Sequence, residues 1–281
     1  MNHRMGCCYR PGAAIAIAVV SVLTGTLVSG QQASPPQSPR SLAPIDLAGY
    51  WVSIVNEDWR WRMMTPPKGD YASLPLTPQA RKVADSWDYE KERGTEEACR
   101  PFGVGGIMRM PGRLHISWAD DVTLKVETDA GTQTRMLYFD GRGASGPRTW
   151  QGHSNATWEF AGQRGSADRN NIPTGGGRGR GRDGQVSTSQ GGSLSVVTTN
   201  MRAGHLRKNG VPYSENASIE EYFDRLTYPN GDVILVVRTS VEDPLYLQMP
   251  FLTSSNFKLE RDGSKWKPTP CAIDPPIVLP K

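Results

Sequence analysis

Glu221 and Arg238 are the two charged residues whose spacing best suits a site. They lie in two predicted strands joined by Asn230-Gly231, a dipeptide typical of the tight type I′ hairpin. If these two residues form the loop, Phe223 lies opposite Arg238, and Glu221 is the diagonal neighbour of that arginine on the same face. We therefore expect the carboxylate and the guanidinium to reach one another inside the fold.

A charged pair in apolar surroundings has two interpretations. It can be an ion pair that only supports the fold, which we favour, or a site for an anionic or hydroxylated ligand. In a barrel enzyme of the lyase, isomerase or hydrolase type, His153 or Glu221 would act as the base, and Tyr222 or an arginine would stabilise the developing oxyanion. His153, Glu221 and Tyr222 are thus the catalytic candidates, and Glu221 and Arg238 are candidates for ligand contacts.

The segment 58–62 alternates cationic and aromatic side chains directly after the first predicted strand. Trp59 and Trp61 on one side of an extended segment can form a flat platform for a sugar ring or an apolar ligand, and Arg62 can hold a carboxylate. The tryptophans can instead be core residues that close a barrel end, because large aromatic side chains are usually buried. Trp59, Trp61 and Arg62 complete the candidates for ligand contacts.

Three histidines follow the first thirty residues, namely His115, His153 and His205. Histidines that converge in a barrel can bind zinc and activate a water molecule. No two of them have a ligand spacing such as His-x-His, so we expect no metal. The chain also lacks a Gly-x-Ser-x-Gly elbow and a Gly-x-Gly-x-x-Gly turn that opens a helix, and we expect no cofactor.

The first thirty residues have the layout of a secretory signal peptide. Two arginines precede an uncharged apolar run at 13–27, which small residues follow up to Gly30. This run is too short to span a membrane, so we expect cleavage after Gly30, no membrane span in the mature chain, and a secreted or periplasmic location. Cys99 and Cys271 then remain as an even pair in an oxidising compartment and predict a disulfide, with two free buried thiols as the alternative.

The composition of the remaining residues divides them into a leader and a folded domain. Residues 31–44, rich in Pro, Ser and Gln, are expected to form a disordered leader, and residues 45–281 a single domain. Within it, residues 163–192 are rich in Gly and Arg and are expected to form a disordered loop. The loop can be an arm that binds RNA or another polyanion, or a surface insertion, which we favour.

The distribution of charge along the chain indicates which class of partner to expect. The formal net charge is +4, but the signal segment and the residues 163–192 account for this excess, so the folded body is nearly neutral. Recognition of phosphates needs a basic face on the fold itself. We therefore expect a small-molecule ligand and no nucleic acid.

The elements that must position these residues are almost all strands. One helix is predicted from a Thr77 cap and Pro78 to about Arg93. Alternating or apolar runs predict strands at 49–56, 113–118, 122–127, 133–139, 148–160, 193–202, 218–228, 232–241 and 253–260. About nine or ten strands with one short helix predict a mainly β, antiparallel fold, either a closed barrel or a sandwich.

The strand at 148–160 leaves one question open. Its odd-numbered residues from Gln151 to Glu159 are all polar, whereas the other face is largely apolar. The polar face lies either in solvent, which we favour, or in the lumen of a barrel.

Gly49-Tyr50-Trp51, at the start of the first predicted strand, resembles the Gly-x-Trp opening of lipocalin-type barrels. The resemblance implies a cup-shaped antiparallel barrel with a small-molecule pocket, in which an arginine, here Arg238, packs over the tryptophan. Longer stretches, such as 213–216 and 241–244, resemble an uncharacterised family of secreted bacterial proteins. The leading hypothesis is an extracytoplasmic barrel that binds an apolar or amphipathic small molecule; the alternatives are a barrel enzyme and a polyanion binder.

Overall fold

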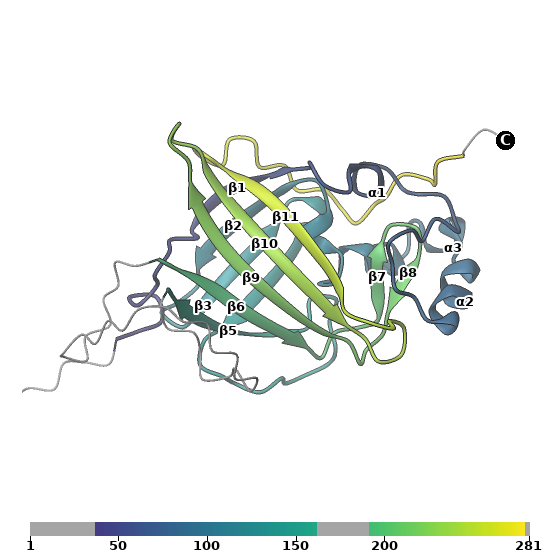
Figure 1. Ribbon diagram of the computed structural model, residues 1–281, viewed down its shortest axis with the longest axis horizontal. Coiled ribbons are helices and arrows are strands. Elements are labelled where there is room, and N and C mark those ends of the chain that lie inside the picture. The colour runs from purple at the N-terminus through teal and green to yellow at the C-terminus, as the bar shows by residue number, and fades with distance from the viewer. Residues whose placement is uncertain (1–36, 162–190, 279–281) are drawn as a thin grey trace, which may run out of the picture. The chain divides into compact units, whose positions relative to one another are not determined.

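The computed structural model describes residues 37–161 and 191–278, and its main element is a closed barrel of nine strands (Figure 1). The barrel strands are β1 (Gly49–Ile54), β2 (Arg113–Trp118), β3 (Thr123–Thr128), β4 (Gln133–Tyr138), β5 (His153–Phe160), β6 (Gly192–Thr199), β9 (Ser218–Thr227), β10 (Val233–Glu242) and β11 (Phe251–Glu260). Every strand that the alternation predicted is present. The mainly β fold and the barrel are thus confirmed.

The barrel is mixed and not purely antiparallel, which corrects the prediction. Its strand order is β1-β11-β10-β9-β6-β5-β4-β3-β2, and β4 pairs with β5 in parallel through Leu137 and Ser154. The other neighbouring strands pair antiparallel. The long connection between β4 and β5 allows this, because parallel neighbours cannot be joined by a tight hairpin.

The interior of the barrel is filled with side chains. Along each strand the inward-facing residues alternate with outward ones, as the pleat requires. The inward residues that are fully or almost fully buried form one hydrophobic cluster, which includes Trp51, Ile116, Leu124, Val126, Leu137, Leu194, Val196, Phe223, Leu235, Val237 and Phe257. On β5 the polar odd-numbered face from His153 to Glu159 points outward, as favoured from the sequence, because Ser154 and Ala156 are the buried residues.

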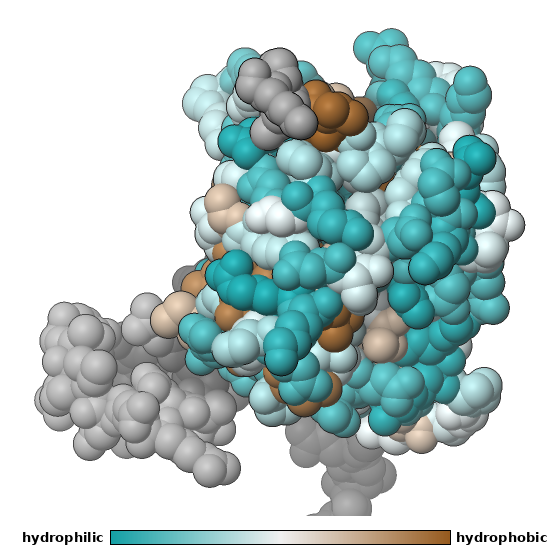
Figure 2. Space-filling model, turned by 90° about the vertical axis from the view of Figure 1, so that its right-hand side faces the viewer, coloured by the Kyte–Doolittle hydropathy of each residue, from teal (hydrophilic) through white to brown (hydrophobic). Residues whose placement is uncertain are grey.

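A cap of short elements covers one end of the barrel (Figure 1), and Figure 2 shows the molecule from this end. The elements of the cap and its linkers are α1 (Trp59–Met63), α2 (Pro78–Ser86), α3 (Tyr89–Glu92), the 3₁₀ helices η1 (Glu96–Phe102), η2 (Ile107–Arg109) and η3 (Ala130–Thr132), and the hairpin of β7 (Gly204–Arg207) and β8 (Val211–Tyr213). A second hydrophobic cluster, which includes Leu76, Ala84, Met201, Leu206 and Tyr213, holds the cap together. The prediction of one helix is therefore wrong, because the described residues form three α-helices. The β7–β8 hairpin was not predicted.

The predicted helix begins where expected but is divided. Thr77 Oγ1 accepts a hydrogen bond from the backbone of Ala80 at 3.1 Å, and Pro78 is the first helical residue. Helix α2 ends at Ser86 because Trp87 adopts an extended backbone, with φ −58° and ψ 139°. The chain then enters α3, which ends at Glu92. The Thr77 cap and Pro78 were sufficient to predict where the helix begins, whereas its interruption after Ser86 depends on the packing of Trp87.

The β9–β10 hairpin has a longer loop than Asn230-Gly231 alone. Thr227 pairs with Val233, and the intervening loop is closed by a 2.8 Å bond from the Tyr228 amide to the carbonyl of Asp232. The register therefore differs by one residue from the predicted one. A slip of one residue moves a side chain to the other face of a sheet.

Some of the predicted segments lie partly or wholly outside the residues that the structure describes. The signal peptide and most of the Gly/Arg-rich loop 163–192 lie outside the described residues. Of the predicted leader, residues 37–44 belong to the folded unit, because the carbonyl of Pro39 accepts a 2.8 Å bond from Trp158 Nε1 and the Arg40 amide binds Asp121. No helix among the described residues has the length and apolar character needed to cross a membrane.

Candidate functional site

A cleft of about 400 Å³ lies where the short helices of the cap meet the C-terminal tail. It is lined by residues from α3 and its flanks, from η1 and from the tail, among them Trp87, Tyr89, Glu92, Pro101, Cys271 and Ile273. A cavity of this size accommodates a small organic molecule. Its walls combine two aromatic rings with a carboxylate, so one ligand can place an apolar and a polar part there.

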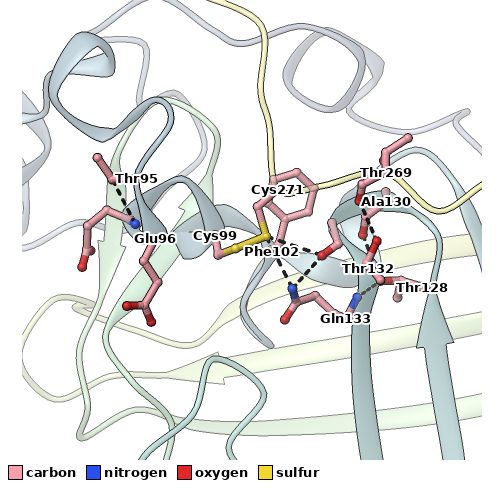
Figure 3. Close-up of a disulfide and its surroundings, with 12 residues drawn as sticks. Thr95, Glu96, Cys99, Phe102, Thr128, Ala130, Thr132, Gln133, Thr269 and Cys271 are labelled. Atoms are coloured by element: carbon pink, nitrogen blue, oxygen red, sulfur yellow. Dashed lines mark hydrogen bonds between the residues drawn. A yellow bond between two sulfur atoms is a disulfide. The ribbon is translucent and has the colours of Figure 1, made fainter.

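The disulfide between Cys99 and Cys271, drawn in Figure 3, ties the C-terminal tail to η1, and Cys271 lines the cleft. It joins η1 to a residue 172 positions later in the chain, which confirms the predicted pairing. Two further contacts fix the tail: Gln133 Nε2 lies 3.4 Å from Cys271 Sγ, and the Tyr89 hydroxyl donates to the carbonyl of Ile273 at 3.3 Å. The tail is thereby kept beside α3 and forms one wall of the cleft.

Trp87 forms another part of the wall, and its contact with Gly210 fixes the position of its indole. The indole is only 6% exposed, and a Cβ atom at position 210 would lie 2.1 Å from Cγ of Trp87. Gly210 also has φ +79°, which residues with a side chain rarely adopt. The glycine between β7 and β8 therefore makes the room in which the indole packs.

Glu92 places a carboxylate between these walls. Its Oε2 accepts a 2.9 Å bond from Trp87 Nε1, and its Oε1 accepts a 2.9 Å bond from Arg100. Burial raises the pKa of Glu92, while the bonds from Trp87 and Arg100 oppose that rise. A carboxylate has about four acceptor positions, so Glu92 retains the capacity to bind a ligand.

His205 lies behind Glu92 without a hydrogen bond to it. Its Nε2 is 3.8 Å from Glu92 Oε1, beyond hydrogen-bond distance, and its Nδ1 has no partner among the described residues. Burial, followed by the charge of Arg100, lowers the pKa of His205 to about 3. The imidazole is therefore neutral near neutral pH.

The structure separates Glu221 from Arg238. Glu221 points into the barrel and is fully buried, as expected, but its partner is Arg135 of β4. Arg238 pairs with Tyr222 in register, points outward with a side chain 59% exposed, and binds Asp224 at 3.1 Å. The predicted Glu221 to Arg238 pair is wrong because of the one-residue register shift, and Arg238 does not pack over the buried Trp51.

The remaining catalytic candidates lie on the outside of the barrel. The Tyr222 hydroxyl donates to Glu220 at 2.8 Å, and His153 Nε2 lies 2.8 Å from the carbonyl of Arg142. The Glu221 carboxylate lies on the inner face of the sheet, opposite to both of these side chains, so the structure does not bring the three catalytic candidates together. The histidines likewise stay apart: His115 lies against Glu127 on β3, His153 is on β5 and His205 is in the cap.

No metal site is formed by the part of the chain that the structure describes, where no three His, Cys, Asp or Glu side chains converge. The weak zinc candidates His115, His153 and His205 are thus separate in the fold.

Trp59, Trp61 and Arg62 lie in helix α1 and not in an extended segment. Residues two apart in a helix do not face each other, so the two rings do not form one platform. Trp59 is 59% exposed, whereas Trp61 packs against Arg207. Arg62 is buried and binds Glu57 at 3.1 Å and the carbonyl of Arg109 at 3.0 Å, which is a structural role.

The chain was compared with known proteins in three ways. No protein family, no curated protein and no solved structure matches it.

The cleft was not predicted as a site from the sequence. Trp87 and Glu92 both lie within the segment from Pro78 to about Arg93 that was predicted as one helix. The available signal was the cysteine pair, because a disulfide between Cys99 and Cys271 must bring the tail to the segment around residue 99. Trp87, Tyr89 and Glu92 all lie within twelve positions of Cys99 in the sequence.

Proposed function

We propose that the protein binds a small amphipathic molecule with a cationic or hydroxylated head group in the cleft beside Glu92. The observation that carries this proposal is the cleft of about 400 Å³, in which Trp87, Tyr89 and the disulfide surround a largely buried carboxylate. The cleft is favoured over the lumen because inward-facing barrel residues pack against one another as a hydrophobic cluster. The disulfide supports an extracytoplasmic location, since disulfides persist in oxidising compartments.

The charges around Glu92 favour a cationic head group. Three acids and two arginines form a network of ion pairs. Arg100 binds Glu92 and Glu97, and Arg202 binds Glu96 and Glu97. Because His205 is neutral, the network keeps one net negative charge. An ammonium group on a ligand would neutralise it and would relieve the cost of the buried carboxylate.

The enzyme alternative has less support from the geometry. A histidine and a carboxylate in hydrogen-bond contact would favour acid-base catalysis, but His205 is 3.8 Å from Glu92, and its pKa of about 3 makes it a weak base. The polyanion alternative rests on residues 163–192, which lie almost wholly outside the described residues. Binding of a small molecule is therefore the function that the described residues support best.

The test compares three ligands of one chain length. An alkylamine, the matching alcohol and the matching carboxylate are titrated calorimetrically against the wild type, Glu92→Gln and Tyr89→Ala. We expect affinities in the order amine, alcohol, carboxylate. Glu92→Gln should weaken the amine about tenfold, the equivalent of about 1.4 kcal/mol, because it removes a charge-assisted contact. Tyr89→Ala should weaken all three ligands, because it removes apolar wall.

The matched control is Glu220→Gln, an exposed acid on the outer face of β9 that accepts a bond from Tyr222. It should leave all three affinities unchanged. Equal binding of the amine and the carboxylate by the wild type, or an amine affinity that Glu92→Gln does not change, would refute the role of Glu92. The absence of binding by every member of a series with four to ten carbons would refute the proposed function.

A further inference from the structure

Arg207 is a buried cation whose N–H groups have no acceptor among the described residues. The residue is 3% exposed, and none of its three guanidinium nitrogens makes a hydrogen bond to described protein atoms. One face of the guanidinium stacks on Trp61, 4.4 Å from the ring centroid. Stacking satisfies the face of the cation but not its N–H edge, and a buried donor without an acceptor is costly.

The acids close to Arg207 are already bound to other arginines. Asp58 and Asp70 are the acids whose charges act on Arg207, but Asp58 binds Arg109 at 2.9 Å and Asp70 binds Arg60 at 2.5 Å. Asp70 also accepts a 3.1 Å bond from Trp61 Nε1. No described acid forms an ion pair with Arg207, so its charge is balanced only at longer range.

A small cavity lies at this cluster of cations. Its volume is about 10 Å³, and Arg207, Arg109, Arg62 and Lys208 line it together with Trp61. A cavity of this size holds a single species about as large as a water molecule. Four cationic side chains thus surround a space for one small acceptor.

The charge beside this space favours an anion over water as the acceptor. Burial, followed by the charge of Arg109, lowers the pKa of Arg207 to about 10, so the side chain remains charged at neutral pH. A water molecule can accept from the N–H edge, but it neutralises none of the charge of Arg207, which forms no ion pair with a described acid. Charge-assisted bonds to an anion are about twice as strong as neutral ones.

We propose that Arg207 is the principal ligand of a small inorganic anion of the size of chloride, with Arg109 and Lys208 supplying further positive charge. The anion would link β7 to α1 through Arg207 and its stacking partner Trp61. This site is independent of the cleft beside Glu92. It requires neither the amphipathic ligand nor its head group.

The first test measures thermal unfolding at constant ionic strength in sodium chloride, sodium bromide and sodium gluconate. Chloride and bromide should raise the melting temperature above that in gluconate, by about 4 °C when the anion exceeds its dissociation constant tenfold. Arg207→Met should abolish the difference. Arg202→Met is the matched control, because Arg202 also stacks on an indole, at 3.9 Å from Trp150, but has acid partners, and it should retain the full difference.

A crystallographic test does not depend on the stability of a variant. Wild-type crystals grown in bromide should show an anomalous peak at the N–H edge of Arg207. Equal melting temperatures of the wild type in chloride and gluconate would overturn the proposal. A map with ordinary water density and no anomalous signal at Arg207 would equally overturn it, because water would then be the sole acceptor.

Discussion

Arg135 of β4 and Glu221 of β9 form an ion pair across the interior of the barrel. Arg135 donates 3.2 Å and 2.5 Å bonds to the two oxygens of Glu221, and the two side chains are 1% and 0% exposed. Thr198 Oγ1 accepts a further bond from Arg135 at 3.4 Å. The pair joins strands that β5 and β6 separate in the sheet order, so it connects opposite parts of the wall.

Glu221→Gln should destabilise the protein strongly, because Arg135 would keep its charge in the interior without a counter-charge. We expect a loss of about 3 to 5 kcal/mol in the free energy of unfolding, measured by urea titration. Arg238→Gln is the control on the outer face and should cost less than about 1 kcal/mol. Urea transitions of Glu221→Gln that coincide with the wild type would contradict the buried pair.

Loss of the disulfide should loosen the tail and the cleft together. The chain-entropy model gives about 5 kcal/mol as an upper value for a closed loop of 172 residues. Cys99→Ser with Cys271→Ser should therefore lower stability and weaken the ligand series. Mass spectrometry of a non-reduced digest should show the peptides with Cys99 and Cys271 linked; their recovery as separate free thiols would show that the bond does not form.

Gly210→Ala should be far more harmful than the same change at Gly231. Both glycines have positive φ, +79° and +86°, but an alanine Cβ at 210 would collide with Trp87, whereas nothing lies within 4 Å at 231. Gly231→Ala should cost about 1 kcal/mol of backbone strain. Gly210→Ala adds displacement of Trp87, which indole fluorescence detects. Equal melting temperatures for the two variants would mean that Trp87 moves freely.

His205 should make the protein sensitive to acid. Its folded pKa of about 3 lies below the value of about 6.5 expected for an unfolded histidine, so the unfolded state takes up the proton first. The stabilisation from neutral His205 is complete above about pH 6.5 and is lost as the pH falls toward 3, by roughly 5 kcal/mol in total. His205→Gln should flatten the stability curve in this window, whereas the outward-facing His153→Gln should not. Parallel curves for all three proteins would exclude His205 as the source.

Short-range patterns were sufficient for most of the fold. Alternation along segments such as 113–118 and 218–228 predicted strands that the barrel contains, and the Thr77-Pro78 signal predicted the start of a helix. The cysteine pair followed from number and compartment alone. These features depend on residues a few positions apart, or on counting, so the sequence carries them directly.

The site depended on relations that short-range patterns do not contain. Whether the loop around Gly231 has two or five residues changes the register by one, and this reversed the face of Arg238. The tail reaches Glu92 only because the disulfide and the cap fold around it.

By itself, the sequence predicted the nine strands of the barrel, the start of a helix at Pro78, the pairing of Cys99 with Cys271, and the inward position of Glu221. Tertiary structure alone decided that Arg135 is the partner of Glu221 and that Arg207 lies buried against Trp61. The physical reason is that strand patterns repeat within a few residues, whereas contacts across a lumen or within a cap arise only when the barrel closes. Closure brings together side chains that are far apart in the sequence and do not lie on neighbouring strands.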